Sequence, residues 1–285
     1  MDHTDDLALR FEEHRSHLRA VAYRLLGSLA EADDAVQEAW LRLSRSDSTQ
    51  VTNLGGWLTT VVSRICLNLL RDRRHRDEQP LDTRVPDPIV SEIDGGDPEH
   101  EAVLADSVSV AMLVVLETLT PAERLAFVLH DLFAMPFDEI GPILDRTPTT
   151  TRQLASRARR RVRGATPTPE PDQARQRAVV EAFLAAARGG DLAALVDLLH
   201  PDVVVRSDGG TLRPSTLVRG PQAVAQGAIV FARIAELTRP TLVNGAVGAV
   251  ALSDGRVVAV AAFTVADGRV LELNILSDPD RLSLL

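Results

Sequence analysis

Two short stretches of this 285-residue chain concentrate its positive charge. Residues 152–163 hold six Arg and no acid, and residues 64–76 hold five Arg against one Asp. The whole chain has a formal net charge of −9 and contains no Lys. Compact basic stripes in an acidic protein are typical of local contact with phosphates. Two solvated helix faces would give the same charge pattern. The choice between these two interpretations therefore depends on the elements that carry the stripes.

The composition sets limits on the class of protein. Hydrophobic residues make up 45% and charged residues 25%, as in soluble globular proteins. No apolar run approaches the roughly 20 residues that span a bilayer, and the acidic start, MDHTDDLALRF, is unlike a secretory signal. The single cysteine, Cys66, allows neither an internal disulfide nor a cysteine-based metal site. We therefore expect a cytoplasmic protein with no membrane segment, no cofactor and no metal.

The first stripe lies on the second helix of a predicted helix-turn-helix. Residues 137–144 and 149–163 have helical periodicity, and Leu154, Ala158 and Val162 are predicted to bury the second helix. In this motif the second helix enters the major groove, where Gln153 and Arg157 can form paired hydrogen bonds to bases. An amphipathic Arg-rich helix on any soluble protein is the alternative.

The second stripe ends a predicted helix over 56–75, which follows a turn-rich loop at 46–56. Arg near a helix C-terminus also complements the helix dipole, which is a purely structural explanation. Residues 5–45 read as two helices that break at Gly27-Ser28. The second of these presents Asp34, Glu38 and Leu41 on one face, either as a docking ridge for a basic partner or as a solvated acidic face.

The rest of the chain alternates linkers and folded segments. Residues 77–101 are rich in acids and Pro and predict a flexible linker, and residues 165–172 predict a shorter Pro-rich one. Residues 173–285 predict an independent α+β domain. Its strands are expected at 202–207, 241–252, 256–265 and 269–276, with hairpin turns at Asp254-Gly255 and Asp267-Gly268.

Residues 5–163 resemble an RNA polymerase sigma factor of the extracytoplasmic-function (ECF) type. The resemblance is carried by three segments in a fixed order: AEADDAVQEAWLRL, GGWLTTVVSRICLNLLRDRRHR and LTPAERLAFVLHDLFAMPFDEIGPILDRTPTTTRQLASRARRRVR. It implies two all-α domains, region 2 in 1–76 and region 4 in 102–164. It also implies a protein that is not an enzyme, and that binds core RNA polymerase and directs promoter recognition and strand opening.

The resemblance implies three sets of contacts. The polymerase partners would be the clamp helices of the largest subunit and the flap of the second largest subunit. The clamp-binding set is Asp33, Asp34, Gln37, Glu38 and Leu41. The set for the −10 element is Asn53, Trp57, Arg64, Asn68, Arg71, Arg73 and Arg74. The set for the −35 element is Thr150, Arg152, Gln153, Ser156, Arg157, Arg159 and Arg160. Leu154-Ala155 departs from a commoner Arg-Leu pair, which leaves the base contacts open.

The C-terminal domain resembles the SnoaL-like cone-shaped α+β barrel, and the combination is similar to the ECF group usually numbered 41. The group's DGGG-type and NPDKL-type motifs are matched imperfectly by Asp208-Gly209-Gly210 and by 278–282, and its WLPEP linker motif is absent. The residues expected at a regulatory pocket or interdomain contact are His200, Asp202, Arg206, Asp208, Gly209, Gly210, Asp278, Asp280 and Arg281. Intramolecular regulation is favoured over ligand sensing, in which the partner would be a small molecule. It is also favoured over catalysis.

Two other classes of protein stay open at this point. An ordinary helix-turn-helix regulator with a ligand-binding domain would explain 121–163 and the C-terminal domain, but not the two earlier segments. A SnoaL-like enzyme with a DNA-binding appendage is the other alternative.

Overall fold

The computed structural model describes residues 3–45, 53–76, 83–91, 108–165, 169–211, 213–230 and 236–285. The chain divides into two compact units, each made of two separate stretches of sequence. Unit 1 contains Met1–Glu78 and Val115–Gly164, and unit 2 contains Gln79–Val114 and Ala165–Leu285. None of the helices in the described ranges has the length and apolar character needed to cross a membrane.

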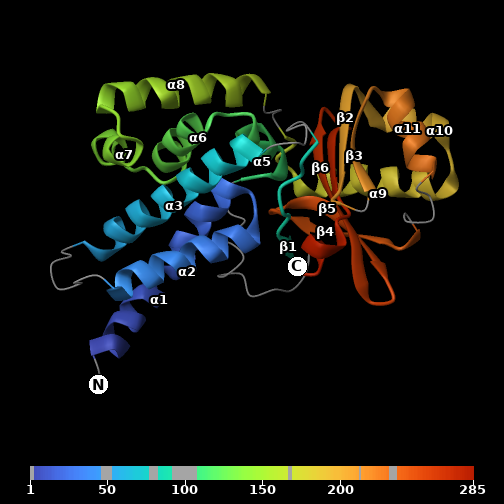
Figure 1. Cartoon of the computed structure of the whole chain (residues 1–285). Coiled ribbons are helices and arrows are strands. Elements are labelled where there is room, and N and C mark those ends of the chain that lie inside the picture. Colours follow the sequence, from blue (N-terminus) through green and yellow to red (C-terminus); the bar gives the residue numbers. More distant parts are fainter. Residues whose placement is uncertain are drawn as a thin grey trace. The chain divides into compact units, whose positions relative to one another are not determined.

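Three long helices form the first part of unit 1: α1 His3–Leu26, α2 Leu29–Arg45 and α3 Leu54–Arg76 (Figure 1). The predicted break is confirmed, since Gly27 has a φ of 66° and ends α1. On α2 the apolar positions Val36, Ala39 and Leu43 are buried against the neighbouring helices, as their spacing predicts. Residues 46–52 of the expected loop lie outside the described residues.

The second part of unit 1 is a set of shorter helical segments. They are α6 Pro121–Phe127, the π-helical turn η2 Val128–Leu132, α7 Phe137–Leu144 and α8 Pro148–Ala165. Thr120 and Glu123 form a capping box at the start of α6, which satisfies backbone N–H groups that the helix leaves free. Segments α6 and α7 pack against α3, and η2 packs against α1.

The turn between α7 and α8 depends on Gly141. Asp145 ends α7 in the left-handed conformation, with a φ of 55°, and the N–H of Arg146 donates to the carbonyl oxygen of Gly141 at 3.0 Å. A Cβ atom at position 141 would lie only 2.7 Å from the carbonyl oxygen of Arg146. The close approach of the two backbones is therefore possible only with glycine, and it fixes where α8 begins.

In its described residues, unit 2 is built on a seven-stranded sheet with the order β1-β4-β5-β6-β7-β2-β3. The strands are β1 Val90–Ser91, β2 Leu199–Gly209, β3 Arg213–Arg219, β4 Thr238–Val243, β5 Ala246–Ser253, β6 Arg256–Ala266 and β7 Arg269–Leu276. All neighbours pair antiparallel except β2 and β7. The turns at Asp254-Gly255 and Asp267-Gly268 are confirmed. The run expected as one strand over 241–252 is two strands, because Asn244-Gly245 turns the chain back.

Different segments cover the two faces of the sheet. Helices α9 Gln173–Gly189, α10 Leu192–Leu198 and α11 Pro221–Val230 pack on one face through an apolar core. The other face carries a smaller core in which Val260, Ala262 and Leu276 contact Val85, Val110 and Leu282. Leu282 comes from the short helix α13 Pro279–Leu282, and Val110 begins α5 Val110–Glu117.

Residues 83–91 differ from the flexible linker that we expected over 77–101. The side chains from Val85 to Ile89 are buried, and β1 pairs with β4 at the edge of the sheet, as Figure 1 shows. Acids and Pro suggested a chain unable to form a core, but Val85 joins the smaller core on the sheet, and Ile89 is also buried. The remaining parts of the expected linker, 77–82 and 92–101, lie outside the described residues.

Candidate nucleic-acid interface and linker site

Helix α8 exposes most of the residues expected to read the −35 element. Arg152, Gln153, Arg157 and Arg160 are exposed, and Thr150, Ser156 and Arg159 are partly buried. The buried face consists of Thr151, Ala155, Ala158 and Val162. The predicted buried position Leu154 is only half-buried, because the apolar stripe runs one residue further round the helix.

Two arginines of α8 are bound to acids of the same unit. Arg159 Nε lies 2.6 Å from Asp131 Oδ1, and Arg161 Nη1 lies 2.9 Å from Glu123 Oε2. These ion pairs join α8 to η2 and to the cap of α6. Arg159, expected at DNA, therefore also holds the helix in place.

A ring stack supports the N-terminal end of α8. The guanidinium of Arg152 lies over the ring of Phe137, 5.4 Å from its centroid. Phe137 in turn stacks on His130, with ring centroids 3.9 Å apart. The arrangement limits where the Arg152 side chain can move, and an Arg held by an aromatic face loses less freedom when it binds a phosphate or base.

The residues of α3 expected at the −10 element have two kinds of environment. Asn68, Arg71 and Arg74 are exposed. Arg73 instead forms an ion pair with Glu31 and donates from Nη1 to the carbonyl oxygen of Leu26 at 2.9 Å. Arg73 therefore connects α3 to the turn between α1 and α2.

The remaining −10 candidates also have contacts inside unit 1. Asn53 Oδ1 accepts from the N–H of Gly56 at 2.9 Å, which caps α3. Trp57 is half-buried. Arg64 is exposed, and its Nη2 donates to the carbonyl oxygen of Pro142 at 3.2 Å, so α3 contacts the first helix of the helix-turn-helix.

The acidic face of α2 lies at the surface. Asp33, Asp34 and Gln37 are exposed, and Leu41 exposes 38% of its surface among them. Arg19 and Arg42 pair with Asp33 and Glu38. Ion pairs at this exposure are weak, so the acids stay available to a basic partner.

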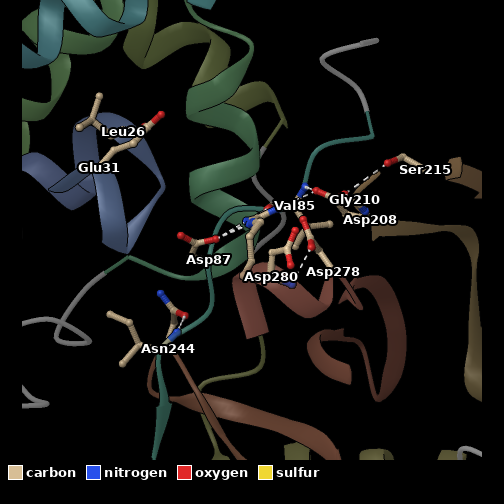
Figure 2. Close-up of polar contacts among 12 residues, drawn as sticks. Leu26, Glu31, Val85, Asp87, Asp208, Gly210, Ser215, Asn244, Asp278 and Asp280 are labelled. Carbon is tan, nitrogen blue, oxygen red and sulfur yellow. Dashed lines mark hydrogen bonds and ion pairs between the residues drawn. The ribbon is translucent and has the colours of Figure 1, made fainter. Parts of the chain in front are cut away.

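A second polar cluster lies in unit 2, and we call Val85, Asp87, Asp208 and Arg281 the linker site. Arg281 Nη1 donates to Asp208 Oδ2 at 2.9 Å, its Nε donates to Asp87 Oδ1 at 2.6 Å, and its Nη2 donates to the carbonyl oxygen of Val85 at 2.6 Å. Asp208 Oδ2 also accepts from the N–H of Val85 at 3.1 Å. Figure 2 shows Val85 beside Asp208. One arginine and one aspartate of the C-terminal domain thus hold the linker backbone.

Two further motif residues support the linker site. Gly210 has a φ of 64°, and a Cβ there would lie 2.4 Å from the carboxylate of Asp278. Asp278 caps α13, whose third residue is Arg281, by accepting from the N–H of Asp280 at 3.0 Å. The side chain of Asp280 is exposed, so its backbone rather than its carboxylate contributes.

The other residues expected in this group lie elsewhere in unit 2. His200 Nδ1 accepts from the N–H of Asp202 at 3.1 Å, and the Asp202 side chain is 88% exposed. Gly209 lies where β2 approaches β3, and a Cβ there would lie 2.6 Å from Cβ of Arg213. The predicted cluster is therefore divided, and His200 and Asp202 are not part of the linker site.

Arg206 belongs to a buried polar group that the sequence did not reveal. Its Nη1 donates to Asn274 Oδ1 at 3.4 Å and lies 3.6 Å from Glu272 Oε1. Burial raises the pKa of Glu272, and Arg206 opposes that effect. Alternation along β7 could have shown that Glu272 and Asn274 share a face, but not that the face is covered.

Among the residues described, no group of three or more His, Cys, Asp or Glu side chains could hold a metal ion. Cys66 is fully buried on α3, and burial raises the pKa of its thiol to about 12. Arg124, buried near this thiol, forms an ion pair with Glu117 at 2.9 Å. The cysteine is therefore a core residue of unit 1.

Comparison with known proteins agrees with this geometry. The Sigma-70 region 2 family matches residues 10–76, and the Sigma-70 region 4 family matches residues 109–162. The ECF RNA polymerase sigma factor SigJ of Mycobacterium tuberculosis is 41% identical over 289 residues, which cover 96% of this chain and 92% of SigJ. This chain belongs to the ECF sigma factors.

Two further similarities extend over the whole sigma factor. The probable ECF sigma factor SigI of Mycobacterium tuberculosis is 31% identical over 286 residues, covering all of this chain and 98% of SigI. The crystal structure of SigJ aligns with a TM-score of 0.78 at 37% identity and covers 97% of this chain and 98% of that one. Because the match includes region 2, the alternative of an ordinary helix-turn-helix regulator is wrong.

The fold predicted for this ECF sigma factor is confirmed. Region 2 corresponds to α1–α3, region 4 contains α6–α8, and both are all-α, while the C-terminal domain is α+β. As a sigma factor the protein binds core RNA polymerase and promoter DNA and directs transcription initiation.

Proposed function

We propose that unit 1 carries the polymerase and promoter contacts of this sigma factor, and that unit 2 regulates them by holding the linker. The observation that carries the proposal is the division of the arginines. Exposed guanidinium groups lie along α8, whereas Arg281 binds the linker with three of its nitrogen atoms. The exposed guanidinium groups suit DNA contacts. The contacts of Arg281 and Asp208 with the linker suit intramolecular regulation, and we call them the latch.

Helix α2 is the proposed docking surface for the clamp helices of the largest polymerase subunit. Asp34 and Gln37 are exposed beside Leu41, which offers a central apolar contact within an acidic rim. Asp33 and Glu38 complete this surface once they exchange their weak intramolecular pairs for basic residues of the polymerase. Region 4 is the proposed contact for the flap of the second largest subunit.

The proposed −35 contacts divide by chemistry. Gln153 and Arg157 are exposed near the start of α8, where a recognition helix meets base edges. Arg160 lies nearly one turn beyond Arg157 and suits a phosphate. Arg159 divides its role between DNA and Asp131.

The proposed −10 contacts are the exposed polar residues of α3. Asn68, Arg71 and Arg74 can reach a melted strand directly, whereas Asn53 and Arg73 position the helix. Arg64 binds the carbonyl oxygen of Pro142, so it would have to leave region 4 before it could contact DNA. A state in which α3 and α7 are in contact is therefore a closed form of unit 1.

In vitro transcription with core polymerase and a promoter selected from genomic DNA tests the promoter and docking contacts. Arg157→Ala and Asp34→Arg should each reduce transcript formation strongly. Arg175→Ala and Glu181→Arg are matched controls on exposed positions of α9 and should leave it unchanged. Arg157→Ala is compared with Arg175→Ala, and Asp34→Arg with Glu181→Arg. If a test variant gives the same transcript output as its control, the proposed contact of that residue is contradicted.

The latch is tested in the same assay with Asp208→Asn and Arg281→Ala, compared with the exposed control Arg269→Ala. Loss of the charged contacts to the linker should change promoter output in both latch variants and not in the control. Unchanged output and polymerase affinity in a folded Asp208→Asn variant would overturn the regulatory role.

A further inference from the structure

Phe137, the first residue of α7, contacts side chains from two other helical segments of region 4. Its ring stacks on the ring of His130 in η2, with the centroids 3.9 Å apart and the planes inclined by 25°. The guanidinium carbon of Arg152 on α8 lies 5.4 Å from the centroid of the Phe137 ring, within the range of a cation–π contact. We call His130, Phe137 and Arg152 the ring stack, and it connects η2, α7 and α8.

The turn after η2 holds His130 in place. Nδ1 of His130 donates to the carbonyl oxygen of Met135 at 3.0 Å, and the N–H of Met135 donates to the carbonyl oxygen of Leu129 at 2.9 Å. Ala134, inside this turn, has a φ of 53°, a conformation that residues with a Cβ atom seldom adopt. Backbone of this kind persists where surrounding contacts determine it, and it is concentrated at functional sites. Phe137 therefore rests on a ring whose own position is fixed.

The start of α8 is fixed as well. The N–H of Thr150 donates to Thr147 Oγ1 at 3.3 Å, and the two hydroxyl oxygens lie 3.0 Å apart. Thr151 is fully buried, and its hydroxyl donates to the carbonyl oxygen of Thr147 at 3.0 Å. These bonds cap the helix one turn before Arg152. The backbone from which Arg152 extends is therefore held independently of the ring stack.

Arg152 is restrained in a different way from two other arginines of α8. Arg159 and Arg161 bind the carboxylates of Asp131 and Glu123, so some of their N–H donors are already used. For Arg152, the described part of the chain supplies the ring contact but no hydrogen bond or ion pair. A ring face attracts the cation without accepting its N–H groups, so the donors of the guanidinium stay available. The ring stack thus limits the movement of Arg152 and leaves its hydrogen-bonding capacity intact.

We propose that Phe137 is a positioning residue for promoter recognition, which holds Arg152 in place for a guanine of the −35 element and so sets how strictly that base pair is selected. This inference rests on the proposed function, in which α8 reads the −35 element. Arg152 is exposed near the start of α8, where a recognition helix meets base edges. Its paired donors fit O6 and N7 of guanine. Because the ring already restrains the guanidinium, less conformational freedom is lost on binding.

The experiment is a double-mutant cycle in the full-length protein bound to core polymerase. Phe137→Leu keeps an apolar side chain but removes the ring, and Phe137→Tyr keeps the ring. Each change is made in wild type, in Arg152→Ala and in Arg160→Ala. Arg160 is exposed on the same helix, about two turns beyond Arg152, and provides the matched control. Affinity is measured for the matched promoter and for promoters in which each −35 base pair is replaced in turn.

We expect Phe137→Leu to lower affinity for the matched promoter about two- to fivefold, as loss of an exposed cation–π contact implies, and Phe137→Tyr to restore it. The same loss should appear in the Arg160→Ala background and disappear in the Arg152→Ala background. It should also disappear on the promoter that lacks the base pair read by Arg152. A Phe137→Leu variant that is merely less stable would lose the same factor with and without Arg152, which would overturn the proposal. An equal loss on all promoters would overturn the assignment to a base.

Nuclear magnetic resonance of the free protein, with isotope-labelled arginine, measures the ring stack without a promoter. The ring current of Phe137 should shift the side-chain resonances of Arg152, which are identified by their absence in Arg152→Ala. The shift should remain in Phe137→Tyr and vanish in Phe137→Leu, and resonances that are equal in wild type and Phe137→Leu would overturn the contact. If Arg152→Ala leaves promoter affinity unchanged, the proposed −35 role of Arg152 fails and the inference fails with it. If Arg152→Ala lowers affinity but is not coupled to Phe137→Leu, the inference alone fails.

Discussion

Arginine has opposite uses in α8 and at the linker site. Arg157 and Arg160 are exposed and free to meet DNA, whereas the guanidinium of Arg281 is occupied by Asp208, Asp87 and the carbonyl oxygen of Val85. Asp87 and Asp208 expose only 6% and 7% of their side chains. The contrast shows that charge alone does not mark a nucleic-acid contact: what matters is whether the donors of the arginine are already used by its own chain.

The largest expected effect comes from removing the side chain of Arg281, whose guanidinium is bound within the chain. Arg281→Ala removes a cationic partner from two buried carboxylates, Asp87 and Asp208, and removing one partner of a buried pair costs about 3–5 kcal/mol. Unit 2 contains neither Trp nor Tyr, so its stability is best followed by hydrogen exchange in β6 and β7. Arg269 is exposed, so Arg269→Ala should change the stability of unit 2 little. Equal losses of stability in the two variants would contradict the contrast between bound and exposed arginines.

Arg157→Ala should affect binding instead of stability. A side chain that pairs with a base edge contributes about 1–3 kcal/mol, so affinity of the holoenzyme for its promoter should fall about 5- to 150-fold. The melting temperature should be unchanged because Arg157 is exposed. Titration of labelled promoter DNA and a thermal melt together provide the check, and a destabilised variant would disprove this assignment.

Arg160→Ala should give a smaller and different change. A phosphate contact carries no sequence information, so affinity should fall by a similar factor on matched and mismatched promoters. The slope of log affinity against log salt concentration should become less steep by about 0.9. Binding measured at several salt concentrations would show this, and a loss confined to the matched promoter would assign Arg160 to bases.

Glu272 provides the smallest test. Burial raises its pKa above the ordinary 4.5, so the folded state binds the proton more tightly than the unfolded state does. The stabilisation from the protonated carboxyl is full below pH 4.5 and is lost as pH rises through the folded pKa. Glu272→Gln cannot titrate, so wild type should lose stability relative to it between pH 4.5 and 7. If stability depends on pH in the same way for both proteins over that range, the raised pKa of Glu272 is contradicted.

The sequence predicted the sigma regions well because their signals are local. Helical periodicity identified α2 and α8, and the order of motifs matched residues 10–76 and 109–162. The outward positions of α8 follow from its buried stripe, apart from the shift at Leu154. The contacts of Arg159 and Arg73 with Asp131 and Glu31 were missed, because the partners lie on other helices.

The linker site was only half visible. Asp208 and Arg281 were predicted as contacts from their motifs, but Asp87, which accepts from Arg281, lies 194 positions away from it. Nothing in local periodicity reports a pairing over that separation. The acids and Pro around Val85 and Ile89 suggested disorder, and only the tertiary structure shows that both side chains are buried, Val85 in the smaller core on the sheet.

Strand β1 has a consequence for the order of events during synthesis. Thr241, on the partner strand β4, is 150 positions after Ser91. At about 5–20 residues per second, a ribosome needs roughly 8–30 s to make that interval. Regions 2 and 4 are therefore complete, and free to meet polymerase or each other, before the strand that captures the linker exists. In every newly made molecule there is therefore a period in which β4 is not yet available to pair with the linker. The rate of translation sets the length of this period.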